Sequence, residues 1–145
     1  MKIKVLEKTE GCMPEIIDNG DWIDLKVSED LRFCAPQANK MHRRRNKNKE
    51  YNQEERTRDV DFHSYIAKLG VAMQLPKGYE AIVVPRSSTF RRYGILQTNS
   101  TGVIDCSYCG EDDEWGMPMV ATRAVIIPKG TRIAQFRIQL SQKAT

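Results

Sequence analysis

Short runs of alternating polar and apolar residues, each ended by a turn, constrain the fold of this 145-residue chain more than any other feature. The tripeptide Pro-Lys-Gly occurs at 76–78 and again at 128–130, with proline and glycine at turn positions that suit them. Each copy leads into an alternating run, Tyr79–Val84 or Ile133–Leu140. No long amphipathic helix interrupts this pattern, which predicts one all-β domain over residues 1–145.

Another alternating run, Trp22–Val27, predicts a strand whose apolar face carries Ile23 and Leu25. Asp24 then lies on the opposite face and is expected to project away from the core. Two interpretations of Asp24 stay open on this pattern, a plain surface charge and a functional carboxylate.

One short helix is expected at Thr89–Tyr93, with Ser87 or Ser88 as its cap and Gly94 as its end. Arg86 directly precedes it. A guanidinium, a hydroxyl and unpaired backbone N–H groups at one point would suit a phosphate. The alternative is an ordinary cap beside a surface arginine.

The stretch Gly102–Glu111 combines a glycine, a β-branched pair, a carboxylate and a tyrosine. The β-branched pair favours an extended backbone, so alternation predicts Asp105 on one face and Tyr108 on the other. Residues 97–102 have the composition of a hairpin tip with free backbone groups. A carboxylate beside such a tip could act as a general base, and the alternative is a solvated aspartate at a strand end.

The cysteines do not form a convincing metal or redox motif. Cys106 and Cys109 form one C-x-x-C pair, but Cys12 and Cys34 lie far away in the sequence. Residues three apart on a strand face opposite ways, and a thioredoxin-like pair would need a helix N-terminus. All four are expected to be free thiols, as in a cytoplasmic protein.

The net charge of +4 comes from one segment. Its basic residues are Lys40, Arg43, Arg44, Arg45, Lys47 and Lys49. Without them the remainder is slightly acidic, so a nucleic-acid-binding face spread over the fold is not expected. Residues 37–61 are almost entirely polar and predict a long, mobile surface loop inserted into the domain. The alternative is a patch that attracts an acidic partner.

No segment is apolar enough for a signal peptide or a membrane span, which predicts a cytoplasmic location.

Four segments occur in the order of known family motifs. Residues 102–111 read G-V-I-D-x-x-Y-x-G-E, preceded by P-R-S-S at 85–88 and followed by G-T-R-I-A-Q at 130–135. A weaker likeness, D-W-I-D-L, lies at 21–25. Together they resemble motifs three, two, four and one of the trimeric deoxyuridine triphosphatase (dUTPase) family. The resemblance implies a distorted jelly-roll-like barrel of the β-clip type with one short helix, assembled as a homotrimer with shared active sites.

The resemblance also implies hydrolysis of dUTP to dUMP and pyrophosphate, dependent on Mg²⁺. Asp105 would activate the water that attacks the α-phosphate. The backbone around Asn99, Gly102 and Ile104 would bind uracil, and the ring of Tyr108 would lie under the deoxyribose.

The phosphate-binding residues implied by the resemblance are Arg86, Ser87, Ser88 and Gln135. Mg²⁺ would be chelated mainly by the triphosphate, because this cation keeps several of its waters. Asp24 would support that hydrated ion through water.

Two departures from the family pattern leave other functions open. Ser88 stands where the second motif usually has glycine, and a glycine-rich, arginine-containing fifth motif is not found after Leu140. Slow hydrolysis is expected for this reason, and one alternative is a non-catalytic or weakly catalytic dUTP-binding regulatory module. The sister family, dCTP deaminase, shares Arg-Ser-Ser, but the Tyr-x-Gly-Glu pattern after Asp105 disfavours it.

Overall fold

The computed structural model of the protein describes residues 1–38 and 60–145. The strands are β1 (Lys4–Glu7), β2 (Glu15–Ile16), β3 (Ile23–Lys26), β4 (Leu31–Phe33), β5 (Gln37–Ala38), β6 (Val60–Asp61), β7 (Ser64–Lys68), β8 (Val71–Gln74), β9 (Tyr79–Pro85), β10 (Ile95–Gln97), β11 (Gly102–Asp105), β12 (Gly116–Ala121), β13 (Val125–Ile127) and β14 (Arg132–Leu140). The helical elements in this part of the chain are α3 (Thr89–Tyr93) and a 3₁₀ turn, η1 (Gln142–Ala144).

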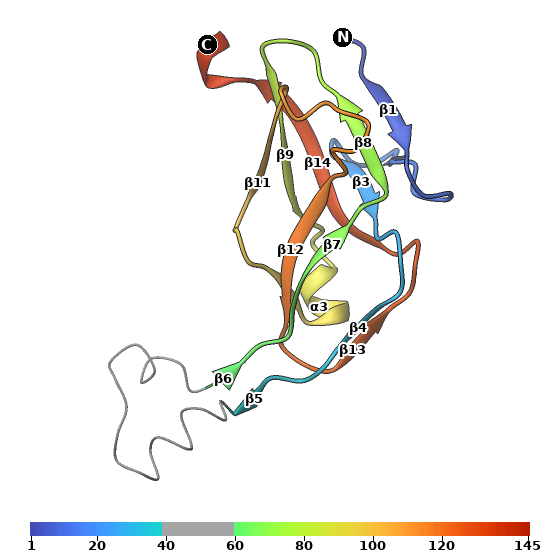
Figure 1. The fold of residues 1–145 in the computed structure, drawn as a ribbon, viewed down its shortest axis with the longest axis vertical. Coiled ribbons are helices and arrows are strands. Elements are labelled where there is room, and N and C mark those ends of the chain that lie inside the picture. The colour runs from blue at the N-terminus through green and yellow to red at the C-terminus, as the bar shows by residue number, and fades with distance from the viewer. Residues whose placement is uncertain (39–59) are drawn as a thin grey trace.

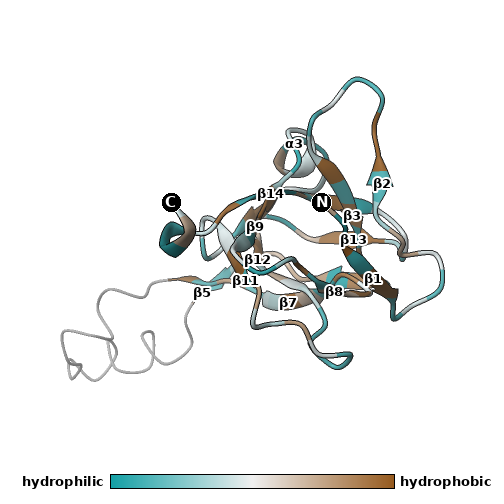
Figure 2. Cartoon of the chain, turned by 90° about the horizontal axis from the view of Figure 1, so that it is seen from above, coloured by the Kyte–Doolittle hydropathy of each residue, from teal (hydrophilic) through white to brown (hydrophobic). Residues whose placement is uncertain are grey.

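Two antiparallel sheets carry most of the fold (Figure 1). One has the strand order β11-β9-β14-β3-β2 and the other the order β10-β12-β7, while β1-β8, β13-β4 and β5-β6 form two-stranded ladders. The all-β prediction is therefore confirmed. The ladders between the described strands do not join into one closed barrel; separate sheets surround a common interior instead (Figure 2).

Residues from both large sheets fill that interior. Trp115 is fully buried and meets Phe136 of β14 edge-on, with 5.2 Å between ring centroids. Leu25 of β3 and Met117 of β12 are also fully buried. Burial of such apolar side chains is the main force that holds the sheets together, at about 25 cal/mol per Å² removed from water.

The alternation predicted for β14 is present along most of the strand. Ala134 and Phe136 face the core, and Arg137 faces solvent. Alternation along Ile133–Leu140 also predicts that Leu140 faces inward, but this residue is half exposed because it pairs with Tyr79 at the end of the sheet, beyond the core. Ile133 is fully buried beside Ala134, where the pairing of β14 with β3 shifts register, so the alternation holds from Ala134 to Arg137.

Both Pro-Lys-Gly segments are turns, as predicted. Gly78 has φ of 89° and Gly130 has φ of 85°. This left-handed conformation is strained for residues with a side chain, so glycine is required at these two positions.

The connection from β10 to β11 is not a hairpin, contrary to the prediction for residues 97–102. β10 pairs with β12 and β11 pairs with β9, so the connection passes from one sheet to the other. The predicted alternation beyond Asp105 is also wrong. The strand ends there, and the carbonyl of Asp105 accepts a hydrogen bond of 3.0 Å from the N–H of Tyr108, which closes a turn.

Helix α3 has the predicted bounds and ends at Gly94, which has φ of 65°. Its cap differs from the prediction. Ser88 holds the cap position, but its hydroxyl makes no capping bond. The hydroxyl of Thr89 instead donates to the carbonyl of Ile133 (2.8 Å) and accepts the N–H of Arg86 (3.1 Å), which ties the helix to β14.

The ends of the predicted insertion are strands, not loop. Gln37 of β5 pairs with Asp61 of β6, and Ala38 pairs with Val60. This short ladder lies at the edge of the fold (Figure 1). The basic residues, the predicted mobility and the alternative of a patch for an acidic partner concern residues 39–59, which lie outside the described residues.

Neither helical element in the described ranges has the length and apolar character needed to span a lipid bilayer. All four cysteines have free thiols, and Cys12 is buried in the core.

Candidate active site

A cavity of about 850 Å³ opens between the two large sheets. Ile104, Asp105 and Tyr108 line one side of it, and Ile66 and Lys68 of β7 line the other. β11 and β7 are both edge strands of their sheets. Each therefore has one side without a neighbouring strand in its sheet, where backbone groups can bind a ligand.

Asp105 is exposed and held in a defined orientation. Its Oδ1 accepts the backbone N–H of Ser107 at 2.9 Å, two residues further along the turn. This backbone hydrogen bond, followed by side-chain hydrogen bonds from Cys106 and Ser107, lowers the pKa of Asp105 below its ordinary value. The carboxylate is therefore ionised at neutral pH and available to accept a proton.

Tyr108 is fixed at its phenolic end. Its hydroxyl donates to the carbonyl of Glu114 at 3.0 Å, while 41% of the residue remains exposed. The ring is thus held at the cavity wall with free area for contact with a ligand.

A second polar cluster surrounds Asp24. Its Oδ2 lies 2.9 Å from Nε of Arg86 and 3.3 Å from Nη1 of Arg132. Asp24 is only 3% exposed although it lies on the face of β3 opposite the core, so its interpretation as a plain surface charge is wrong. Burial raises the pKa of Asp24 against the opposing pull of Arg86 and Arg132.

The position of β3 explains this burial. The strand lies between β14 and β2, so Asp24 has Gln135 on one side and Glu15 on the other. Arg132, at the start of the neighbouring strand β14, and Arg86, directly after β9, then contact its carboxylate. Sequence reasoning missed Arg132 as a site residue, although it lies within the fourth motif.

The two clusters are at opposite ends of the same sheet. Asp105 pairs with Glu80 at the start of β9, whereas Arg86 follows Pro85 at its end. Six residue steps along the chain separate Glu80 from Arg86, or about 20 Å of extended strand. One chain therefore brings Asp105 together with Tyr108, and Arg86 together with Asp24, but it does not bring the two groups together.

Comparison with known proteins decides the family. The family model described as dCTP deaminase-like matches residues 16–141. The SPbeta prophage-derived deoxyuridine 5′-triphosphate nucleotidohydrolase of Bacillus subtilis (strain 168) is 42% identical over 144 residues, covering 99% of this chain and 82% of that protein. The chain belongs to the dUTPase family.

Solved dUTPase structures share the fold. The dUTPase from Streptococcus mutans superimposes with a TM-score of 0.69 at 19% identity, covering 97% of this chain and 95% of that one. The dUTPase from phage phi11 of S. aureus gives a TM-score of 0.68 at 16% identity, covering 97% and 91%, respectively. That structure was described as visualising a species-specific insert.

Of the remaining residues predicted from the dUTPase resemblance, Ser87, Ser88 and Gln135 lie near Arg86, whereas Asn99 and Gly102 do not line the cavity of Asp105. Ser87 is exposed and Ser88 is buried beside Arg86, and Nε2 of Gln135 donates to the carbonyl of Pro85 at 3.1 Å. Asn99 is exposed in the connection between β10 and β11.

Gly102 opens β11 opposite Val83. A Cβ atom at Gly102 would lie 3.3 Å from Cβ of Val83, so even alanine would crowd this position. This close approach explains why glycine stands at the start of the strand that carries Ile104 and Asp105.

Members of the dUTPase family generally use a divalent metal ion. The described residues contain no group of three or more His, Cys, Asp or Glu side chains that could hold one. The Asp24 carboxylate is already paired with two guanidinium groups. These side chains therefore do not fit direct coordination of Mg²⁺, and the role predicted for Asp24 gains no support from its surroundings.

Proposed function

We propose that this protein hydrolyses dUTP to dUMP and pyrophosphate, with Asp105 as the general base. The observation that carries this proposal is the shared cavity of Asp105 and Tyr108, in which an ionised carboxylate and a fixed aromatic ring face the same space. The relative that is 42% identical has this activity in its name, which gives the substrate class.

The reaction is a displacement at the α-phosphorus. Asp105 accepts a proton from a water molecule, whose oxygen forms a new bond to phosphorus while the bond to the bridging oxygen breaks and pyrophosphate leaves. The N–H of Ser107 holds Oδ1, so the exposed carboxylate of Asp105 keeps one orientation toward the water. A carboxylate with a lowered pKa is a weak base, so orientation has to supply much of the rate enhancement.

The nucleoside would lie along the free edge of β11. Backbone groups at Asn99, Gly102 and Ile104 can form hydrogen bonds to the edge of uracil. The ring of Tyr108 would pack under the deoxyribose and leave no room for a 2′-hydroxyl.

Arg86, Ser87, Ser88 and Gln135 would bind the phosphates. Nε and Nη1 of Arg86 are engaged with Asp24 and with the carbonyl of Arg132, which leaves its remaining N–H groups for an anion. Gln135 keeps one of its two amide hydrogens free after bonding to Pro85. Mg²⁺ would arrive on the triphosphate, whose oxygens supply ligands that this cation prefers.

The separation of the two clusters supports a site shared between subunits of a homotrimer. The α- and γ-phosphorus atoms are only two bridging oxygens apart, so a triphosphate cannot join groups that lie about 20 Å apart along β9. A substrate bound at Asp105 of one subunit can therefore be reached only by Arg86 and Gln135 of a neighbouring subunit.

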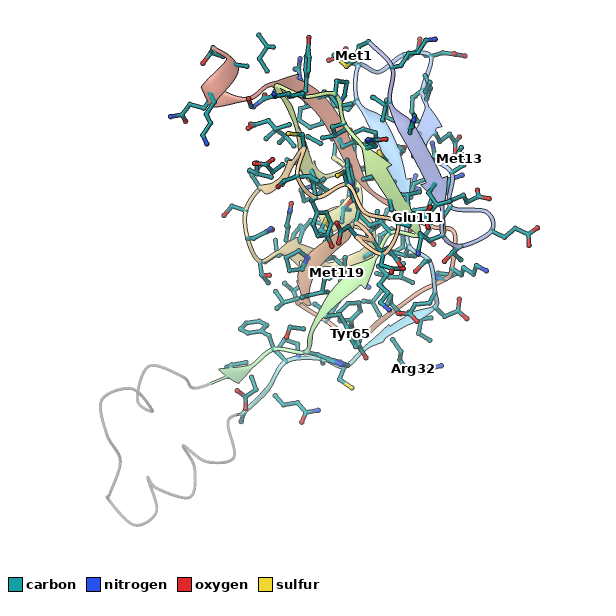
Figure 3. All side chains as sticks on the ribbon, turned by 45° about the horizontal axis from the view of Figure 1, so that its top comes forward. Met1, Met13, Arg32, Tyr65, Glu111 and Met119 are labelled. Atoms are coloured by element: carbon teal, nitrogen blue, oxygen red, sulfur yellow. The ribbon has the colours of Figure 1, made fainter. Side chains whose placement is uncertain are left out.

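An exposed apolar face next to the cavity is a suitable subunit contact. On the outer side of the sheet β10-β12-β7, Leu96 pairs with Val120 and Pro118 pairs with Ile66. Ile66 is 73% exposed and Leu96 is 46% exposed. The inner side of the same strands carries Met119 opposite Tyr65 (Figure 3). Ile66 belongs both to this outer face and to the wall of the cavity. A neighbouring copy that packs on this face would therefore place its Arg86 close to the cavity.

Ile66→Asp is expected to convert the oligomer into a folded monomer, because the charge would have to be buried in an apolar contact. Light scattering at micromolar concentration, together with circular dichroism, measures this change. Ile126→Asp is the matched control, since Ile126 is also exposed but lies on the separate ladder β13-β4. A trimer that persists in Ile66→Asp would show that this face is not the contact.

Separate incubations with dUTP and with dCTP test the reaction itself. Release of pyrophosphate from dUTP is expected. Ammonia from dCTP would indicate a deaminase, and tight binding of dUTP without pyrophosphate release would indicate a non-catalytic regulatory module.

A further inference from the structure

Glu114 links the cavity wall to the core although it lies outside the family motifs. Its Oε2 accepts the backbone N–H of Gly70 at 3.1 Å, a contact between residues 44 positions apart in the sequence. Its backbone carbonyl accepts the hydroxyl of Tyr108 at 3.0 Å. One residue thus holds the tyrosine with its backbone and the β7–β8 turn with its side chain.

Gly70 is a rigid anchor for this bond. It is buried, has φ of 72°, and a Cβ atom at this position would lie 2.5 Å from Cβ of Cys12. Its carbonyl accepts the N–H groups of Lys8 and Thr9, at 2.7 and 3.2 Å. Loss of the Glu114 carboxylate would leave the buried N–H of Gly70 without this acceptor, a costly state for a backbone donor.

The backbone beside Glu114 is fixed to the same turn. Trp115 donates its N–H to the carbonyl of Val71 at 2.8 Å and accepts the N–H of Leu69 at 2.9 Å. The hydrogen bond from Gly70 to the Glu114 side chain fixes one more residue of this segment, the residue whose carbonyl accepts the hydroxyl of Tyr108. The orientation of the ring therefore depends on a contact made outside residues 102–111.

We propose that Glu114 is a positioning residue that fixes Tyr108 and thereby sets the discrimination between deoxyribose and ribose. The inference rests on the proposed dUTP hydrolysis. Small displacements of groups that position a substrate reduce rates strongly, and a looser ring at the sugar would admit a 2′-hydroxyl.

Two variants separate the hydrogen bond from the charge. Glu114→Gln keeps an oxygen that can accept the N–H of Gly70, whereas Glu114→Ala does not. Asp112→Ala is the matched control, because it removes an exposed carboxylate from the same loop, one whose ion pair among the described residues is with Lys8 on the surface.

The measurement is kcat/KM for dUTP and for UTP. The ratio of the two is expected to fall about tenfold in Glu114→Ala. It is expected to stay within about twofold of the wild-type ratio in Glu114→Gln and in Asp112→Ala. An unchanged ratio in Glu114→Ala overturns the proposal, and an equal fall in Glu114→Gln would assign the effect to charge instead.

A double-mutant cycle with Tyr108→Phe tests the route of the effect. The phenylalanine ring remains but loses the bond to the Glu114 carbonyl, so adding Glu114→Ala should lower the ratio by much less than it does in the wild type. Full additivity would contradict a path through the tyrosine hydroxyl.

Amide hydrogen exchange provides a readout that does not require activity. Exchange at Gly70 and across residues 106–115 is expected to be faster in Glu114→Ala than in Asp112→Ala. If the wild-type protein hydrolyses neither nucleotide, the proposed function fails, while the exchange comparison still tests whether the Glu114–Gly70 hydrogen bond supports Tyr108. Equal exchange in the two variants overturns that support.

Discussion

Asp105→Asn is expected to lower the turnover of dUTP by about 10²–10⁴-fold, the range associated with loss of a general base. The amide has nearly the same shape, and its oxygen can still accept the N–H of Ser107, so the turn after β11 is retained. Asparagine cannot take a proton from water at neutral pH. Binding of dUTP is expected to stay close to that of the wild type.

Single-turnover kinetics and equilibrium binding of dUTP measure the two effects separately. Asp112→Asn is the control, because it neutralises an exposed carboxylate in the same loop. Turnover that stays near normal in Asp105→Asn would show that another group activates the water.

The pH dependence of the wild-type rate follows from the lowered pKa of Asp105. A general base works in its ionised form, so activity is lost as the pH falls through the pKa of the folded protein. An ordinary aspartate has a pKa near ~3.9. The loss due to Asp105 is therefore expected below that value, and the rate should not fall because of this group between neutral and mildly acidic pH.

Asp24→Ala is expected to lower the free energy of unfolding by roughly 3 kcal/mol, toward the lower end of what breaking a buried ion pair costs. The substitution leaves the guanidinium groups of Arg86 and Arg132 next to each other without their shared carboxylate. The lower end is appropriate because the arginine side chains are 22% and 37% exposed. Arg86 should also lose its fixed orientation, which weakens the binding of the triphosphate.

Urea denaturation measures the stability, and the KM for dUTP reports on the phosphate site. Asp21→Ala is the matched control, since Asp21 is 79% exposed and lies 3.8 Å from Arg137, a pair of the kind that contributes little. Equal stability of the two variants would show that the Asp24 cluster is not a structural ion-pair network.

Elements defined by local patterns could be predicted closely from the sequence. Helix α3 begins at Thr89 and ends at Gly94 as expected, because a glycine in the left-handed conformation is a local requirement. Gly78 and Gly130 likewise require only their own turns. Alternation placed Asp105 and Tyr108 on opposite faces, whereas the resemblance of residues 102–111 to a dUTPase motif grouped them, and the structure places both at one cavity.

Features that depend on contacts between distant strands could not be predicted. The environment of Asp24 is made by Arg86 and Arg132, and the support of Tyr108 comes from Glu114 and Gly70. Period-two alternation tells which face a side chain is on but not what covers that face. The pairing of β11 with β9, and not with the preceding strand β10, could not be predicted for the same reason, because it depends on contacts between distant strands.

The sequence by itself determined the all-β class, the turns, the short helix and the identity of the motifs, because each depends on neighbouring residues and their intrinsic backbone preferences. Tertiary structure alone decided that Asp24 is buried, that the barrel does not close, and that Asp105 lies about 20 Å of strand away from Arg86. Those outcomes depend on strand order and register, which are set by the packing of residues far apart in the chain.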